Sequence, residues 1–311
     1  MKVGPHLIGF ALLTLLYISA LVYIDRDNHV FEHGVSLTQI LPLVALFALA
    51  SFLLRYLRWR WLLARRKCRV PWVVGFLSYL SGFALTASPG KVGELLRLRY
   101  FGKMGVPADQ MIACFVFERT ADLIVVLLLS AGLGFVPGAA LAFAFVALVI
   151  AAVIVLSRTT ALWVALAARL RKAEWHDLAK MLLALANGLA GAVSFLTPRE
   201  FTVAMVLGFA AWTIQSLGCV YLLSKLGIAI PPLAAFSLYP LALLIGAASL
   251  LPGGIGTTEV AIVLFLRSFG VPLGSAALAA VGMRISTLWF ATALGFMAVA
   301  TLEIAGTKRE T

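Results

Sequence analysis

Charged residues are scarce in this chain. Only 12% of its 311 residues are Asp, Glu, Lys or Arg, and 62% are apolar, whereas soluble domains average about 25% charged residues. Apolar runs of about 20 residues, the length that crosses a hydrocarbon layer of roughly 30 Å, recur along the whole chain. The composition therefore excludes a water-soluble fold and predicts an all-α polytopic membrane protein.

Residues that bind metals or carry out nucleophilic chemistry are also few. The three cysteines, Cys68, Cys114 and Cys219, lie far apart and are not grouped with any of the four histidines. This spacing argues against a disulfide framework and against a zinc site. The chain also lacks a nucleotide-binding loop, a hydrolase elbow and a nucleophile beside a base. We therefore expect no catalytic residue, no metal, no cofactor and no ATP hydrolysis by this chain.

Acidic residues are outnumbered, with 13 Asp and Glu against 25 Lys and Arg. The basic residues lie in short loops beside apolar runs, a distribution that fits membrane topology and anionic lipids rather than nucleic acid. The densest basic cluster, residues 55–69, follows the second apolar run and is expected in the cytoplasm, together with both termini. Trp59, Trp61 and Trp72 in and beside this cluster fit an interfacial aromatic belt.

The apolar runs predict about six full spans and two re-entrant hairpins. The hairpin at 71–103 is expected to break at Pro89-Gly90, and the hairpin at 231–267 at Pro252-Gly253. Irregular backbone at membrane depth is tolerated where it is buried in protein or lines a cavity. The charged segment 159–199 is expected to form amphipathic helices on the cytoplasmic surface.

The sequence contains an internal repeat. Pro89-Gly90-Lys91-Val92-Gly93 matches Pro252-Gly253-Gly254-Ile255-Gly256, and 165 residues separate Glu94 from Glu259 and Arg119 from Arg284. We therefore divide the chain into two membrane repeats, residues 1–137 and 138–311. Since the first repeat makes an odd number of crossings, the second should be inverted, as in many transporters with a substrate site at the repeat interface. A duplication retained only for packing is the alternative.

The two Pro-Gly motifs are candidate binding elements. Proline interrupts a helix, glycine lets the backbone approach a ligand, and the next helix presents its amides to a phosphate or carboxylate. The candidate substrate-binding residues are Pro89, Gly90, Lys91, Gly93, Glu94, Arg119, Pro252, Gly253, Gly254, Gly256, Glu259 and Arg284. Glycines that merely allow helices to cross closely would explain the same motifs.

Ionisable residues at membrane depth need partners. Arg119 and Arg284 are expected to hold a lipid phosphate through the planar guanidinium fork. Glu118 and Asp122 are candidates for an ion pair or a proton step, and Asp122 lies three residues beyond Arg119 on the same helical face. Structural ion pairing explains these residues as well as headgroup binding does.

The residues Ser78-Tyr79-Leu80-Ser81-Gly82, Pro89 to Glu94, Glu118-Arg119 and Leu251 to Gly256 with Glu259 resemble the lysylphosphatidylglycerol synthase transmembrane, or flippase-like, family. The resemblance implies a membrane protein of the prokaryotic cell envelope. In relatives fused to an aminoacyl-lipid synthase domain, the membrane part is thought to flip the product. Because this sequence ends at Thr311, soon after its last span, we expect a stand-alone member without a synthase domain.

These patterns lead us to expect an inner-membrane flippase or translocase for an anionic phospholipid or a polyprenyl-phosphate-linked substrate. The alternatives are a membrane-embedded lipid-modifying transferase and an accessory subunit that docks such a transferase through its basic surface helices. Membrane lipids are the expected partners, nucleic acid is not, and the oligomeric state stays open.

Overall fold

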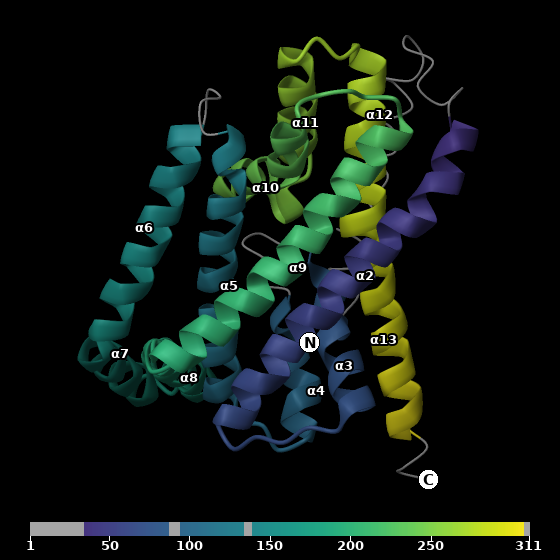
Figure 1. The fold of residues 1–311 in the computed structure, drawn as a ribbon. Helices are drawn as coiled ribbons and strands as arrows, with labels where there is room; N and C mark the ends of the chain where they lie inside the picture. Colours follow the sequence, from purple (N-terminus) through teal and green to yellow (C-terminus); the bar gives the residue numbers. More distant parts are fainter. Residues whose placement is uncertain (1–33, 87–93, 134–138, 308–311) are drawn as a thin grey trace.

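The computed structural model describes residues 34–86, 94–133 and 139–307, and these residues form helices and short connections without any strand (Figure 1). Within this part of the chain, three helical segments are long and apolar enough to cross a membrane: Leu37–Arg65, Pro198–Lys225 and Leu273–Ala305. A fourth is added if Phe143–Arg158 and Thr160–Lys172, bent by 65° at their junction, count as one span. The all-α membrane class is thus confirmed, whereas the number of spans stays a prediction.

Two long helices cross at the centre of the molecule. Helix α2 (Gly34–Arg65) and helix α9 (Pro198–Lys225) run in opposite directions, so the end of α2 lies near the start of α9 (Figure 1). Helix α9 starts at a standard cap, where the Thr197 hydroxyl accepts a hydrogen bond from the Glu200 amide and Pro198 takes the first helical position. Glycines bring the helices close, because a Cβ on Gly218 would lie 3.1 Å from the Phe47 Cβ.

Shorter helices follow each of these two long helices. After α2 come α3 (Trp72–Ser81), the 3₁₀ turn η2 (Gly82–Leu85), α4 (Arg97–Lys103), α5 (Ala108–Leu129) and η4 (Ser130–Leu133). After α9 come α10 (Pro232–Ala248), η5 (Pro252–Gly254), α11 (Thr257–Ser268), α12 (Leu273–Arg284), the π-turn η6 (Ile285–Trp289) and α13 (Phe290–Thr307). The intervening segment forms α6 (Ala139–Arg158), α7 (Thr160–Lys172) and α8 (His176–Val193).

The turns after the long helices use the same hydrogen bond. The Cys68 amide donates to the Leu63 carbonyl at 3.0 Å, and 160 residues later the Ile228 amide donates to the Leu223 carbonyl at 2.9 Å. A left-handed residue precedes each donor: Lys67 has φ 61° and Gly227 has φ 69°. This is the common way in which a helix ends and its last carbonyls are satisfied.

A second turn also recurs. The Val106 amide donates to the Phe101 carbonyl at 3.2 Å between α4 and α5, and the Val271 amide donates to the Leu266 carbonyl at 3.1 Å between α11 and α12. These pairs are 165 residues apart, the separation that relates Glu94 to Glu259. The local backbone is therefore alike at corresponding points after α2 and after α9.

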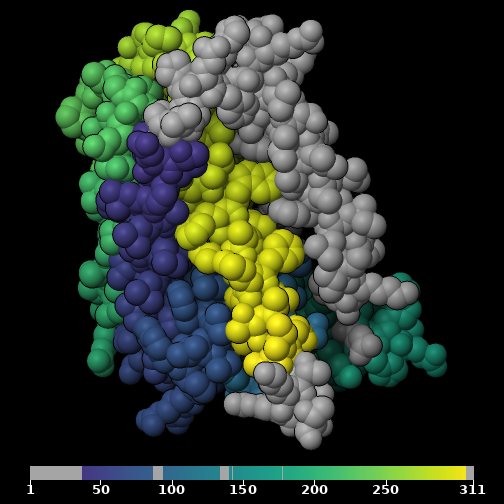
Figure 2. All heavy atoms as spheres, turned by 90° about the vertical axis from the view of Figure 1, so that its right-hand side faces the viewer, coloured from purple at the N-terminus to yellow at the C-terminus, as the bar shows by residue number. Residues whose placement is uncertain are grey.

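Helix α13 covers one face of the molecule, where Figure 2 shows it lying beside α2. It packs against the first hairpin region, since a Cβ on Gly295 would collide with the backbone of Phe83 and Ala84 in η2. The C-terminal part of α13 also contacts α4 through an exposed ion pair, in which Arg99 Nη2 lies 3.1 Å from Glu303 Oε1. Elements far apart in sequence thus enclose the region around α3, α4 and α5.

Candidate functional site

Six charged side chains form ion pairs with one another between α2, α4 and α5, and Arg55, one turn before Arg58 on α2, is a seventh charge, buried beside them. We call them the charge cluster: Arg55, Arg58, Glu94, Arg97, Glu118, Arg119 and Asp122. Six are buried, and the side chain of Arg119 alone among them is partly accessible, with 18% of its surface exposed. Because isolated buried charges are strongly destabilising, such a cluster persists only where its members pair with one another or with a ligand.

The strongest contacts join Arg58 to the carboxylates of α5. Arg58 Nη2 donates to Asp122 Oδ1 at 2.7 Å and to Glu118 Oε1 at 3.2 Å. Glu118 Oε1 also accepts a hydrogen bond from the Tyr79 hydroxyl at 2.8 Å, and Arg97 Nη2 donates to Glu94 Oε2 at 2.7 Å. The bonds to Glu118 and Asp122 tie α2 and α3 to α5, and Arg97 Nη1, 3.6 Å from Glu118 Oε2, ties α4 to it by an ion pair.

Arg119 is held more loosely. Its Nη1 lies 3.7 Å from Glu94 Oε1, and its Nη2 lies 3.2 Å from Asp122 Oδ2 and 3.7 Å from Glu118 Oε2. These are ion-pair distances, but neither Nε nor Nη2 has a hydrogen-bond partner among the described residues. Arg119 therefore pairs its charge with three carboxylates, but the N–H groups of its Nε and Nη2 have no hydrogen-bond acceptor among the described residues.

The cluster as a whole has more donors than acceptors. In the described part of the chain, six guanidinium nitrogens of its arginines are buried without a hydrogen-bond partner, against two carboxylate oxygens. Four arginines against three carboxylates leave one positive charge. Oxygen atoms of an anion would supply the missing acceptors, and bidentate contacts to phosphate or carboxylate suit the planar guanidinium.

Aromatic rings hold two of the arginines in place. The Arg97 guanidinium carbon lies 4.8 Å from the ring centre of Trp59 and 4.5 Å from that of Tyr79. The Arg55 guanidinium lies 4.1 Å from the ring centre of Trp212 on α9. Such cation–π contacts fix the guanidinium planes without consuming their N–H donors.

A second, smaller site lies at the break before α11. Arg284 Nε donates to Glu259 Oε1 at 2.9 Å, and Arg284 Nη2 donates to the Gly253 carbonyl at 2.7 Å. The other oxygen of Glu259 accepts a hydrogen bond from the Gly256 amide at 2.9 Å, which caps the start of α11. The structure thus brings Glu259 together with Arg284, as it brings Glu94 together with Arg119.

Glycine is required at this break. The helical run stops at Ala248 and resumes at Thr257, and Gly253, Gly254 and Gly256 between them have φ of 61°, 63° and 85°. Residues with a Cβ rarely adopt these angles. The corresponding candidates in the first hairpin, Pro89, Gly90, Lys91 and Gly93, lie outside the described residues.

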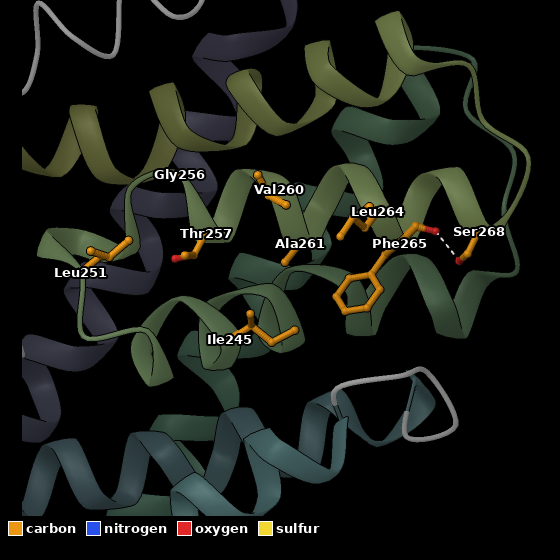
Figure 3. Close-up of a pocket in the computed structure, with 9 residues that line it drawn as sticks. All are labelled: Ile245, Leu251, Gly256, Thr257, Val260, Ala261, Leu264, Phe265 and Ser268. Atoms are coloured by element: carbon orange, nitrogen blue, oxygen red, sulfur yellow. Dashed lines mark hydrogen bonds between the residues drawn. The ribbon is translucent and has the colours of Figure 1, made fainter.

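An apolar groove runs between α10 and α11, beside this second site (Figure 3). Its volume is about 530 Å³, and it is lined by Ile245, Leu251, Gly256, Thr257, Val260, Ala261, Leu264, Phe265 and Ser268. Hydroxyl groups occur at its ends, from Thr257 near the break and from Ser268 at the far end of α11 (Figure 3). Gly256 joins the groove to the Glu259–Arg284 pair through its amide.

Sequence reasoning missed three arginines of the charge cluster. It also missed the role of Tyr79, which donates a hydrogen bond to Glu118 of the cluster. Arg55 and Arg58 belong to the basic cluster expected in the cytoplasm, but their side chains are buried because α2 continues well past Leu54 and packs against α5 and α9. Arg97 was not singled out, and it is buried at the start of α4 against the rings of Trp59 and Tyr79. The interfacial position predicted for Trp59 is likewise wrong, since this side chain is completely buried. One signal could have indicated that Arg55 and Arg58 are buried. They are three residues apart, and therefore on one helical face, among large aromatic residues.

Metal chemistry finds no support in the described residues, where no group of three or more His, Cys, Asp or Glu side chains could hold an ion. The carboxylates of the charge cluster are interleaved with arginines instead. The arrangement can bind an anion through guanidinium N–H groups that have no acceptor among the described residues.

Comparisons with known proteins agree with this membrane architecture. A "UPF0104 membrane protein" of Methanothermobacter thermautotrophicus is 31% identical over 115 residues, which span 36% of this chain and 34% of that protein. No solved structure matches the chain. The sequence model of the family described as "Lysylphosphatidylglycerol synthase TM region" matches residues 7–295. This chain therefore belongs to the family of the lysylphosphatidylglycerol synthase TM region.

Proposed function

We propose that this chain is a translocase of the prokaryotic inner membrane that moves a lipid with an anionic headgroup across the bilayer. The charge cluster binds the headgroup phosphate, and Arg119 makes the first contact. The observation that carries this proposal is the pair of unused donors on Arg119, Nε and Nη2, in a cluster with one excess positive charge.

A purely structural cluster explains this observation less well. A buried donor without a partner costs about 1–3 kcal/mol, so a cluster selected only for packing would be expected to match donors to acceptors. A phosphate adds negative charge and several acceptor oxygens. Arg119 is also the arginine of the cluster whose side chain is partly exposed, although its Nε and Nη2 atoms are themselves buried in this structure.

We further infer that the two halves of the chain form an inverted repeat. In support, equivalent hydrogen bonds end the helices of both halves, Glu and Arg pair at corresponding positions, and α2 and α9 run in opposite directions (Figure 1). Inverted repeats allow alternating access, in which the two halves exchange conformations around a shared site. Such exchange would expose the headgroup to one side of the membrane at a time.

The groove between α10 and α11 supplies a site for one hydrocarbon chain of the same lipid. Its lining is apolar along its length, and its end at Gly256 adjoins the Glu259–Arg284 pair. A volume of about 530 Å³ falls within the range of ligand pockets. An anionic phospholipid and a polyprenyl-phosphate-linked sugar share this combination of an acidic headgroup and a long hydrocarbon chain.

Purified protein in liposomes tests the proposal. We expect fluorescent phosphatidylglycerol or a labelled polyprenyl-phosphate sugar to redistribute between leaflets without chemical change, and neutral phosphatidylcholine to stay in place. A new lipid product would favour the membrane-embedded transferase instead. Absence of both redistribution and product, in protein that is folded, would favour the accessory subunit.

Arg119→Lys is the decisive variant. Lysine keeps the charge but loses the planar fork, so translocation should fall by about tenfold, which corresponds to one lost bidentate contact. Arg199→Lys, on an exposed position at the start of α9, is the matched control and should behave like the wild type. Wild-type translocation by Arg119→Lys would contradict headgroup binding at this residue.

A further inference from the structure

The interface between α2 and α9 contains polar atoms that packing alone does not explain. Five of them are buried without a hydrogen-bond partner among the described residues: Ser51 Oγ and Arg55 Nε on α2, and Trp212 Nε1, Gln215 Nε2 and Ser216 Oγ on α9. We call these five residues the polar seam. Buried polar atoms in proteins are almost always paired, so a group of exceptions at one interface needs a cause.

Ser51 and Ser216 differ from the helical Ser78 and Thr120, although Ser237, Thr258 and Ser286 are likewise buried without a hydrogen-bond partner among the described residues. Ser78 and Thr120 donate their hydroxyls to the carbonyl four residues earlier, at 2.7 and 2.9 Å. This is the usual arrangement for such residues inside apolar helices. The hydroxyls of Ser51 and Ser216 make no such bond, although both side chains are completely buried.

Contacts between the two helices place the seam residues together. Arg58 packs against Gly208, Arg55 lies over Trp212, and Phe47 packs against Gly218. Because the helices are antiparallel, each step backwards along α2 pairs with a step forwards along α9 (Figure 1). Ser51, four residues before Arg55, is therefore level with Gln215 and Ser216.

The seam lies between the charge cluster and the Glu259–Arg284 pair. Arg55 belongs to the charge cluster, and beside it Arg58 of α2 packs against Gly208 of α9. Further along both helices, Gly282, two residues before Arg284, packs against Leu37 of α2 and Leu222 of α9, so Ser51 and Ser216 lie between these two levels. On the side of Arg284, the Tyr239 hydroxyl of α10 donates to the Thr287 hydroxyl at 2.8 Å. Thr287 lies in the π-turn η6, directly after Arg284, and π-turns inside helices frequently mark functional sites.

We infer that the polar seam is the path along which the lipid headgroup passes between the charge cluster and the Glu259–Arg284 pair. This inference rests on the proposed function and adds the route to it. The seam offers N–H donors from Arg55, Trp212 and Gln215 and hydroxyls from the two serines, which match the phosphate and hydroxyl oxygens of a headgroup. In this structure the seam is closed, so passage requires α2 and α9 to separate.

Cysteine accessibility tests the route without relying on transport. The three native cysteines are first removed from the full chain by Cys68→Ser, Cys114→Ala and Cys219→Ala. Single cysteines are then introduced by Ser51→Cys or Ser216→Cys and treated with a membrane-impermeant, charged methanethiosulfonate. We expect both to react about tenfold faster than Ala48→Cys and Ala204→Cys, because the rate follows the population of the open form. The controls lie on the same two helices, are equally buried and pack in an apolar cluster.

Substitutions of Gln215 that remove or keep its amide group provide a second test of the route. Gln215→Leu should lower translocation of phosphatidylglycerol about tenfold at equal protein amounts, whereas Gln215→Asn keeps the amide and should retain most activity. Seam cysteines that react as slowly as the controls, or a Gln215→Leu variant with wild-type translocation, would overturn the inference. Reactive seam cysteines in a protein that moves no lipid would instead contradict the proposed function and leave the polar path standing.

Discussion

Arg58 is the cation on which the charge cluster depends most. Its side chain is completely buried, and one nitrogen, Nη2, donates to both Glu118 and Asp122. No other described arginine donates a hydrogen bond to both of these carboxylates, and Arg119 contacts them only as an ion pair, at 3.7 and 3.2 Å. Removing Arg58 would therefore leave two buried carboxylates short of a partner, which costs far more than the loss of an exposed ion pair.

Arg58→Met should consequently destabilise the protein by about 3–5 kcal/mol. Thermal unfolding in detergent measures the loss. Arg99→Met removes the partly exposed pair with Glu303 and is the control, with an expected change of about 0–1 kcal/mol.

The double variant Arg58→Met with Asp122→Leu separates pairing from packing. If the carboxylates need Arg58 chiefly as a counter-ion, the second change should recover part of the lost stability. A double variant that is less stable than the sum of both single changes would contradict this role. It would point to packing of the arginine itself between α2, α5 and α9.

At the residue scale, the sequence identified the members of the cluster that stand out in apolar surroundings. Glu94, Glu118, Arg119 and Asp122 were predicted as site residues, and the structure brings all four together. Arg55, Arg58 and Arg97 were not predicted, because they belong to runs of basic residues that resemble solvated loops. Which arginine in such a run turns inward depends on the helix opposite it.

Among the elements, α11 links the polar and apolar parts of the proposed site. Glu259 caps its start and pairs with Arg284, while Val260, Ala261 and Leu264 on the same helix line the groove (Figure 3). A lipid whose headgroup is held near Arg284 could therefore place a hydrocarbon chain along α11.

Filling the groove should block that chain. Val260→Trp introduces a large ring at a position that lines the groove and is 56% exposed, so it fills space without overpacking the core. We expect reduced cross-linking of a lipid with a photoreactive group on its hydrocarbon chain. Val206→Trp, at a position 61% exposed on α9, is the matched control. Equal cross-linking of both variants would show that the groove holds no lipid chain.

On the scale of the whole molecule, the ends of the helices lie at two opposite ends of the bundle. Helix α9 starts near the end of α2, at the end of the bundle where α7 also lies, and its last turn reaches the other end of the molecule (Figure 1). Lys172 is the last residue of α7 and Lys67 follows α2, so both lie at the first of these ends. Gly227 follows α9 and lies at the second.

Labelling of single cysteines in intact cells tests the orientation. Gly227→Cys should react with an impermeant reagent added outside, and Lys172→Cys and Lys67→Cys only after permeabilisation, because basic residues are retained in the cytoplasm. Reaction of Lys172→Cys in intact cells would reverse the orientation. It would leave the proposed repeat and the charge cluster unchanged.

The sequence by itself determined the membrane class, the family and the spacing that pairs each Glu with its Arg. Long apolar runs have few alternatives to helices in a bilayer, since every backbone hydrogen bond must be satisfied internally. Turn residues act locally, so the break before α11 followed from proline and glycine at adjacent positions.

Only the tertiary structure decided which charges are buried together and what lies between them. Arg55 and Arg58 are buried in the charge cluster because α2 packs against α5 and α9, and Arg97 joins it from α4 through Glu94 and Glu118. Ser51 is level with Gln215 because α2 and α9 pack in one particular register. Register and burial depend on the surface of a partner helix that is distant in sequence. Helical periodicity and local turn chemistry carry no information about that partner.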